Sequence, residues 1–345
     1  MERIGMIEKY FASANGYGGF RSYFSSIFNE EELKRFYIIK GGPGTGKSTL
    51  MRRVAEEIGK DAESCELILC SSDPASLDGV ILSTKNGKVA IVDGTAPHLT
   101  DTRFPGAVSE IISLGDGWDS SGLRARRKEI TELTLKKNAE YTAAYELLAA
   151  AGKIRSKVIS ASSKHFDTKR AARAAKILLS EVTEYRGKIS ARLIGSFGKD
   201  GGYSLPISDK YKKIKICGSY SSAVLYMSVI KKTAEDYGYL KAPLPSALSE
   251  DIYDGILTCN TAFVISSDGI SADTFLTDLT TFEVEELRAL EAMHEELLEL
   301  SKRRFFAASM YHFSLEEIYS SYMDYSKSEG LEARVKGDFR SALGL

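Results

Sequence analysis

The chain has few cysteines, and none is arranged to bind zinc or to carry out redox chemistry. Its four cysteines, in 345 residues, include no pair with CxxC spacing, which excludes zinc-ribbon and thioredoxin-like sites. We therefore expect buried, reduced thiols at all four positions, which are Cys65, Cys70, Cys217 and Cys259.

The sequence also lacks long apolar runs and an excess of charge of either sign. No uncharged stretch approaches the roughly 18 residues that a membrane-spanning helix requires, and no apolar segment near the N-terminus resembles a signal peptide. The 46 basic side chains nearly cancel the 47 acidic ones, so no global field attracts nucleic acid or an anionic membrane. We expect a soluble, cytoplasmic protein without a membrane or nucleic-acid partner, and its oligomeric state is left open.

The apolar content is sufficient for a sizeable core. Hydrophobic residues make up 43% of the chain and charged residues 27%, as in ordinary globular proteins. At roughly 100–200 residues per domain, this length suggests two domains.

The strongest local pattern is a strand, a glycine-rich loop and a helix in succession. Residues 36–39 form a short apolar, aromatic and β-branched run that is typical of a buried parallel strand. Residues 41–48 fit G-x-x-x-x-G-K-[ST], the pattern of a phosphate-binding loop. The helical spacing of apolar residues over 50–58, with Gly59 as a stop, predicts the helix that must follow.

These residue types suit the phosphates and the magnesium ion of a nucleoside triphosphate. Glycines let the backbone wrap an anion, and the helix N-terminus adds partial positive charge. Lys47 would reach the β- and γ-phosphates, and Ser48 would supply a hydroxyl ligand for Mg²⁺. The glycines concerned are Gly41, Gly42, Gly44 and Gly46.

A second apolar strand carries an acid that would complete the magnesium site. Residues 88–93 end in Asp93, which fits the Walker B pattern of a carboxylate facing the phosphate crevice. The next residue is Gly94, so the water-activating glutamate of many ATPases is missing at that position. Four side chains could replace it, with His98 the best placed; they are Asp73, Asp78, His98 and Asp101.

Two sets of arginines could stabilise charge on a transferring phosphate. Arg103 follows Asp93 closely in the sequence, and a basic cluster occupies residues 124–128. For the cluster, a solvated helix face is the simpler interpretation.

The two halves of the chain resemble each other. Five blocks occur in the same order in both halves, and the spacing between matched residues falls from 183 to 164 along the chain. This order predicts a duplication in which the second copy has lost loop residues. The blocks begin at Lys9 and Arg192, Phe36 and Lys213, Leu77 and Tyr253, Ala90 and Ala262, and Leu123 and Leu287.

The second copy has lost the residues that bind phosphate. The positions of Gly44, Gly46, Lys47, Ser48 and Asp93 are taken by Ser221, Ala223, Val224, Leu225 and Ile265. Without a lysine, a hydroxyl ligand and an acid, this half should not bind a magnesium nucleotide in the usual way. We expect it to fold as a pseudo-NTPase lobe.

Each copy ends in a long helical stretch whose apolar spacing suits an antiparallel coiled-coil arm. We therefore predict an α/β fold, a P-loop NTPase with two tandem Rossmann-like lobes of three α/β/α layers. The first lobe would span residues 1–187 with its arm at 122–187. The second would span 188–345 with its arm at 283–328. A glycine-rich stretch at 187–206 would form the junction between the two lobes.

Several segments resemble a family of uncharacterised bacterial P-loop ATPases with two tandem halves. The segments are GGPGTGKSTLMRR, CSSDPASLDGV, VDGTAPH and PGAVSEIISLG, and the similarity is close over residues 9–150 and weaker beyond. The resemblance implies ATP with Mg²⁺, bound by Asp93 and by Gly41, Gly42, Gly44, Thr45, Gly46, Lys47, Ser48 and Thr49. It implies no particular substrate or partner.

Three functions are compatible with the sequence. The first is a Mg-dependent ATPase whose hydrolysis moves the arms or the second lobe; adenine is favoured because no Asn-Lys-x-Asp string is present to read guanine. The second is a small-molecule or nucleotide kinase, in which Asp73 and Asp78, in a predicted polar loop at 71–79 after a strand at 66–70, position an acceptor hydroxyl. The third is a nucleotide-sensing interaction protein without catalysis, which the glycine after Asp93 favours.

Overall fold

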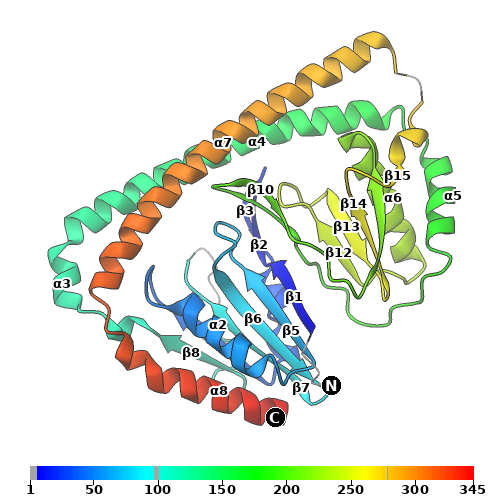
Figure 1. The fold of residues 1–345 in the computed structure, drawn as a ribbon. Coiled ribbons are helices and arrows are strands. Elements are labelled where there is room, and N and C mark those ends of the chain that lie inside the picture. The colour runs from blue at the N-terminus through cyan, green and yellow to red at the C-terminus, as the bar shows by residue number, and fades with distance from the viewer. Residues whose placement is uncertain (1–5, 97–100, 278) are drawn as a thin grey trace. The chain divides into compact units, whose positions relative to one another are not determined.

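The computed structural model describes residues 6–96, 101–277 and 279–345 as a mixed α/β protein with two main sheets and two long helices (Figure 1). Contacts divide the chain into two compact units, and each unit combines segments from both halves of the sequence. Unit 1 comprises Met1–Ser13, Ser22–Ala143 and Arg304–Leu345, and unit 2 comprises Ala14–Arg21 and Ala144–Arg303.

Unit 1 is built on a six-stranded mixed sheet with the order β1-β5-β6-β7-β4-β8. β1 is parallel to β5, β4 is parallel to both β7 and β8, and β6 is antiparallel to both of its neighbours. The strands are β1 (Met6–Phe11), β4 (Arg35–Lys40), β5 (Ser64–Leu69), β6 (Leu77–Thr84), β7 (Gly87–Asp93) and β8 (Ser109–Ser113).

The predicted strands at 36–39, 66–70 and 88–93 are confirmed as β4, β5 and β7. The predicted polar loop at 71–79 is wrong at its end, because β6 already begins at Leu77. The buried apolar run that starts at Val80 lies between β5 and β7, and pairing with β5 extends the strand back to Leu77, with Asp78 as the extra residue at an irregularity in the register.

Helices α2 (Lys47–Ile58) and α8 (Glu329–Leu343) pack against each other and against the sheet of unit 1 (Figure 1). Side chains of β4 alternate between the two faces of the sheet. Tyr37 packs against Phe339 of α8, with ring centroids 5.7 Å apart. Phe36 stacks instead on Phe28, which follows the short helix α1 (Phe24–Ile27).

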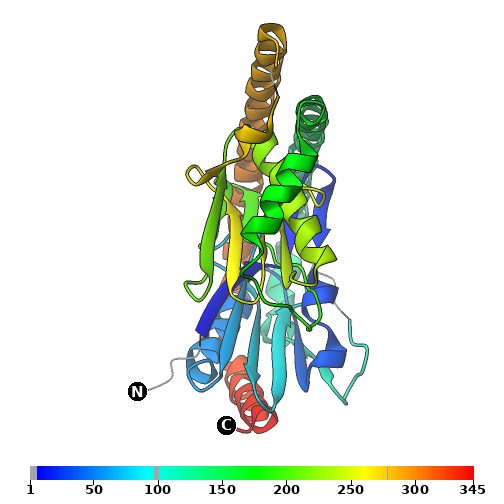
Figure 2. The same ribbon diagram turned by 90° about the vertical axis from the view of Figure 1, so that its right-hand side faces the viewer.

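Unit 2 contains a five-stranded sheet with the order β12-β13-β14-β11-β15. Helix α5 (Thr168–Leu178) packs beside α6 (Tyr220–Asp236), and α6 packs on the sheet (Figure 2). The strands are β11 (Lys212–Cys217), β12 (Ala242–Pro245), β13 (Tyr253–Leu257), β14 (Thr261–Ile265) and β15 (Ile270–Ser271).

The five strands of unit 2 repeat the order and directions of β5-β6-β7-β4-β8 in unit 1. Their register also coincides with the alignment of the two halves. An irregularity at Ile68/Leu69 recurs at Leu244/Pro245. The matched pairs are Phe36–Ala90 with Lys213–Ala262, and Gly79–Val92 with Gly255–Val264.

Each half also carries a small hairpin, and here the alignment needs a one-residue shift. Strands β2 (Ser13–Gly16) and β3 (Gly19–Ser22) match β9 (Gly195–Gly198) and β10 (Gly201–Ser204) at a spacing of 182, whereas the sequence suggested 183. Left-handed glycines mark the same point of each turn, with φ of +95° at Gly19 and +85° at Gly201.

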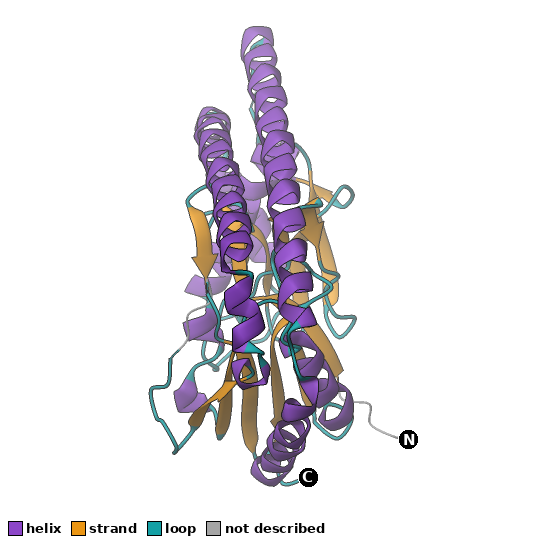
Figure 3. Cartoon of the chain, turned by 90° about the vertical axis from the view of Figure 1, so that its left-hand side faces the viewer, coloured by secondary structure: helices purple, strands orange, loops and turns teal. Residues whose placement is uncertain are grey.

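The predicted arms are helical. Both long helices are drawn in purple in Figure 3. After the short α3 (Ser120–Ala125), α4 (Arg127–Ser163) starts in unit 1 and ends in unit 2, and α7 (Thr281–Ser321) starts in unit 2 and ends in unit 1. Within unit 2 the two helices pair through Arg155 and His294, and within unit 1 through Glu140 and Arg304.

The units do not follow the predicted division after residue 187. Helix α5 of the first half joins the core of unit 2, where Ala175 is fully buried beside Tyr226. Helix α8 of the second half is buried in unit 1 through Val335 and Phe339. Each unit is therefore completed by a helix from the other half of the sequence.

All four cysteines are free, but the expectation that all are buried is wrong, because Cys259 is exposed. Across the described ranges, no helix combines the length and apolarity needed to cross a membrane.

Candidate functional site

The glycine-rich loop connects β4 to α2 in unit 1, as the sequence predicts. β4 lies between β7 and β8, so the loop leaves the interior of the sheet at its carboxyl edge. Gly44 has φ of +70° and Gly46 has φ of +85°, a left-handed conformation that glycine adopts without strain. These two residues let the backbone turn sharply into the first turn of α2 at Lys47.

Lys47 and Asp93 lie together at this edge. The Lys47 ammonium donates to the carbonyl oxygens of Gly41 at 2.8 Å and Gly42 at 2.7 Å. It lies 3.6 Å from a carboxylate oxygen of Asp93, and both side chains are largely buried. The structure therefore unites the predicted phosphate-binding lysine with the predicted metal-binding acid.

The hydroxyl groups around the loop hold neighbouring segments in place. Ser48 Oγ accepts a hydrogen bond from the backbone N–H of Leu77 at 2.9 Å, which ties α2 to β6. Thr45 Oγ1 donates to the carbonyl of Gly42 at 2.9 Å, and the side chain of Thr49 is exposed. Thr95 donates its backbone N–H to Asp93 Oδ1 at 2.8 Å.

A second acid, Asp78, is buried beside Asp93. Burial, and secondarily the charge of Asp93, raises the pKa of Asp78 to about 8, although a hydrogen bond with Cys70 and the charge of Lys47 act in the opposite direction. Burial also raises the pKa of the Cys70 thiol. At neutral pH Asp78 is therefore mostly protonated, so it can donate a hydrogen bond but is a poor general base.

Within unit 1, side chains of the two long helices α4 and α7 lie near the glycine-rich loop. The sequence motifs did not identify them. Tyr141 of α4 is hydrogen-bonded to Ser72 in the segment after β5. Burial lowers the pKa of Lys137, one turn earlier on α4. Burial and the charges of Lys137 and Lys47 lower the pKa of His312 on α7. The only sequence signal was a lysine within the apolar stripe of the predicted arm.

The end of α7 and the segment after it contact the glycine-rich loop directly. The Tyr325 hydroxyl donates to the carbonyl of Gly44 at 2.7 Å. A Cβ at Gly44 would come within 2.2 Å of Ser320 Oγ, so glycine is required here for close packing as well as for its φ. Tyr325 lies in the 3-10 turn η4 (Tyr325–Ser328).

Other predicted site residues are placed elsewhere or cannot be assessed. Arg103 forms an ion pair with Glu31 at 2.7 Å, and its backbone N–H donates to Glu30 near the start of β8, at the opposite edge of the sheet from Lys47. His98 lies outside the described residues. Arg126 of the basic cluster pairs with Glu129 on the exposed surface of the helical arm.

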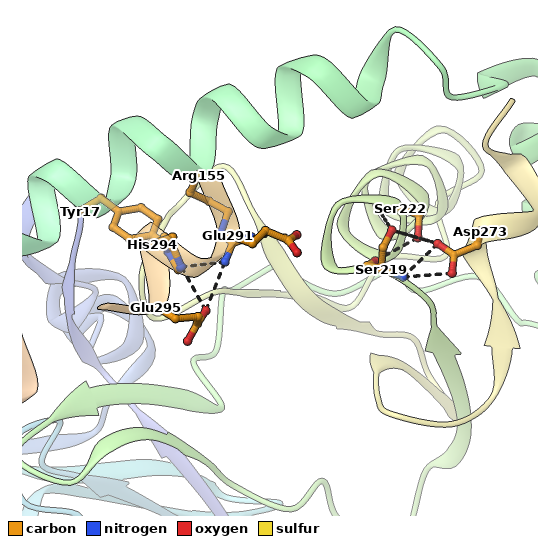
Figure 4. A network of polar contacts seen from close by, with 8 residues as sticks. All are labelled: Tyr17, Arg155, Ser219, Ser222, Asp273, Glu291, His294 and Glu295. Atoms are coloured by element: carbon orange, nitrogen blue, oxygen red, sulfur yellow. Dashed lines mark hydrogen bonds and ion pairs between the residues drawn. The ribbon is translucent and has the colours of Figure 1, made fainter. Parts of the chain in front are cut away.

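In the second half, a carboxylate of the chain itself occupies the corresponding helix N-terminus. Ser219 caps α6, and Asp273 accepts from its backbone N–H at 2.9 Å and its hydroxyl at 2.9 Å (Figure 4). The Ser222 hydroxyl donates to the same carboxylate at 2.5 Å. Burial opposes ionisation, but hydrogen bonds from Ser222 and Ser219 outweigh it and lower the pKa of Asp273. The position that would favour an anion is thus already filled by one.

A buried polar cluster lies in the same unit. Arg155 donates to Nδ1 of His294 at 2.8 Å, and Nε2 of His294 lies 2.8 Å from the Tyr17 hydroxyl (Figure 4). His294 is buried, and burial and then the charge of Arg155 lower its pKa. Asp254, the counterpart of Asp78, is partly buried, and desolvation raises its pKa to about 6.

Within the described residues, no group of three or more histidine, cysteine or acidic side chains could hold a metal by itself. A magnesium ion that keeps most of its waters and also contacts phosphate needs fewer protein ligands. Searches against protein-family models, curated proteins and solved structures give no match for this chain.

Proposed function

We propose that the chain is a Mg-dependent P-loop ATPase with one working nucleotide site, located in unit 1. The observation that carries the proposal is the position of Lys47, at the start of α2, next to Asp93 and behind two left-handed glycines. This combination favours a polyphosphate anion and a divalent cation at the same point. ATP is the preferred nucleotide on the grounds of the sequence motifs alone.

The residues present suit the phosphates. The Lys47 ammonium now rests on the carbonyl oxygens of Gly41 and Gly42, and these bonds would be exchanged for stronger charge-assisted ones to β- and γ-phosphate oxygens. Lys137 and His312 approach the same space from the long helices and could respond to charge at the terminal phosphate. Nucleotide binding would therefore change the electrostatic environment of side chains on α4 and α7, the two helices that continue into unit 2.

The residues present also suit magnesium. Ser48 Oγ and the Asp93 carboxylate are hard oxygen ligands, and both belong to segments held by hydrogen bonds from Leu77 and Thr95. When bound, Mg²⁺ neutralises charge on the phosphates. Asp78 keeps its proton at neutral pH, which limits the repulsion between the two neighbouring acids.

A nucleotide-sensing protein without turnover is the second candidate. Gly94 supplies no acid after Asp93, and Asp78 is protonated at neutral pH, so neither of these two positions supplies a strong general base. Such a site would bind nucleotide and release phosphate slowly. A kinase would require an acceptor pocket at the same edge, for which Asp73 is the remaining acidic candidate.

Turnover of ATP labelled in the γ-phosphate tests the proposal. Wild type should release labelled phosphate without any acceptor, and Lys47→Ala should reduce binding and release at least about a hundredfold. Lys60→Ala is the matched control, because this exposed lysine lies just beyond the other end of the same helix. Label transfer to a metabolite pool would replace the ATPase with a kinase, and tight binding without release would replace it with a sensor. Equal turnover by Lys47→Ala would reject the site itself.

A further inference from the structure

A pocket of about 250 Å³ opens in unit 1 at the carboxyl end of β8. One wall consists of the end of β8 and the loop that continues into the 3-10 turn η2 (Gly115–Gly117). The other wall consists of the segment from the end of α7 through η4 to the first turns of α8. Its principal side chains are Ile112, Leu114, Asp116, Met323, Lys327 and Leu331.

The same two walls reach the glycine-rich loop. Trp118, just after η2, packs on Gly42, where a Cβ would lie 3.1 Å from the indole ring. Tyr325, within η4, donates to the carbonyl of Gly44. A hydrogen bond of 2.9 Å from the Asp324 N–H to the Gly117 carbonyl joins the walls to each other. The segments that line the pocket therefore also contact the glycine-rich loop, through Trp118 and Tyr325.

The lining combines polar and apolar groups, and the polar groups contribute the larger part of its surface. Ile112 and Leu114 are buried, and the flexible thioether of Met323 adapts to the faces of flat rings. The Asp116 carboxylate can accept from amino or hydroxyl groups, and the Lys327 ammonium can donate to ring nitrogens or carbonyl oxygens. The Arg334 guanidinium, which forms an ion pair with Glu110 at 2.7 Å, also lines the pocket. A heterocycle attached to a sugar would use both the apolar and the polar parts of this lining.

We propose that this pocket binds the purine nucleoside part of the nucleotide whose phosphates lie on the glycine-rich loop. The proposal rests on the function proposed above, because it assigns the second half of the same ligand. The base would lie between the Met323 and Leu331 side and the Ile112 and Leu114 side. Asp116 and Lys327 would then contact its polar edge or the ribose hydroxyls, and the segment from Met323 to Leu331 would serve as the specificity-determining wall.

Calorimetric titration of the full chain with MgATP, MgGTP and magnesium tripolyphosphate tests this assignment. Wild type should bind at least one of the two nucleotides roughly tenfold or more tighter than tripolyphosphate, because only the nucleotides bury a base. Ser328→Trp fills the pocket and should reduce nucleotide affinity to that of tripolyphosphate, with tripolyphosphate affinity unchanged. Gly330→Trp is the matched control, because a side chain there meets no atom within 4 Å.

A second variant distinguishes a loss of binding from a loss of folding. Asp116 is exposed, so Asp116→Ala should fold normally and weaken nucleotide binding about three- to tenfold without affecting tripolyphosphate. Nucleotide affinity equal to that of tripolyphosphate in wild type, or unchanged nucleotide affinity in both pocket variants, would overturn the assignment while leaving the phosphate site intact. If none of the three ligands bound, the proposed function would fail, and this assignment with it.

Discussion

Two carboxyl groups of the chain respond to burial in opposite ways, according to the hydrogen bonds around them. Asp78 is buried beside another acid, and its pKa is raised to about 8. Asp273 also experiences burial, but three donors at the start of α6 stabilise its ionised form and lower its pKa. The sequence identified both residues as acids, but not these opposite states, because the deciding neighbours come from distant segments.

Asp78→Asn should stabilise the protein at neutral pH. In the folded wild type, Asp78 keeps its proton up to about pH 8, whereas in the unfolded chain it loses the proton above about pH 4. The free energy of unfolding therefore falls as the pH rises from about 4 to about 8. Asparagine removes this penalty, and for a pKa raised from about 4 to about 8 we expect a gain on the order of 5 kcal/mol at pH 8 that shrinks toward pH 4. Urea unfolding across this range measures the difference.

Asp254→Asn is the internal comparison for that variant. The pKa of Asp254 is raised only to about 6, so its gain should develop between about pH 4 and 6 and then level off. A gain from Asp78→Asn that increased as the pH fell would contradict the assignment of a raised pKa.

Asp273→Ala should destabilise unit 2 by about 1–2 kcal/mol at pH 7, because it removes the acceptor for Ser219 and Ser222 at the start of α6. Since the pKa of Asp273 is lowered, its contribution is present above about pH 4 and is lost as the pH falls through the folded-state pKa. Chemical unfolding at pH 7 and pH 3 measures both parts. Asp268→Ala is the control: its exposed pair with Lys215 should contribute little, and an equal loss from both variants would contradict the capping role.

At the scale of elements, the sequence pattern predicted those helices, strands and loops that depend mainly on interactions between residues close together in the chain. The strand, loop and helix over residues 36–58 could be predicted because apolar spacing and glycines specify them directly. The extent of β6, and the position of Lys137 and His312 near the glycine-rich loop, could not be predicted. Both depend on contacts between segments that lie far apart in the sequence. The contact of Tyr325, in η4, with the glycine-rich loop at Gly44 likewise depends on segments that lie far apart in the sequence.

Helix α8 should be essential for unit 1 although it comes from the other half of the sequence. Phe339 is fully buried against Tyr37 of β4, so Phe339→Ala should lower the free energy of unfolding by about 3–5 kcal/mol. Phe306→Ala, at an exposed position of α7, should change it by less than about 0.5 kcal/mol. Urea unfolding followed by circular dichroism measures both, and a small effect of Phe339→Ala would show that α8 is not part of the folded core of unit 1.

At the scale of the whole molecule, two sheets of the same strand order carry different chemistry. In unit 1 the loop after β4 presents Lys47 beside Asp93, and in unit 2 Asp273 fills the corresponding helix N-terminus. The sequence predicted the loss of the second site from its missing residues. The sequence could not predict that α5 joins unit 2 and α8 joins unit 1. The apolar face of an amphipathic helix shows that the helix packs on a sheet, but not on which of the two sheets it packs.

The number of nucleotides bound per chain tests the central claim most directly. Calorimetric titration of the full chain with MgATP should give one site per chain, and Lys47→Ala should abolish it while Asp273→Ala leaves the number at one. Binding that persists in Lys47→Ala, or two sites per wild-type chain, would contradict the account of a single phosphate site at the start of α2.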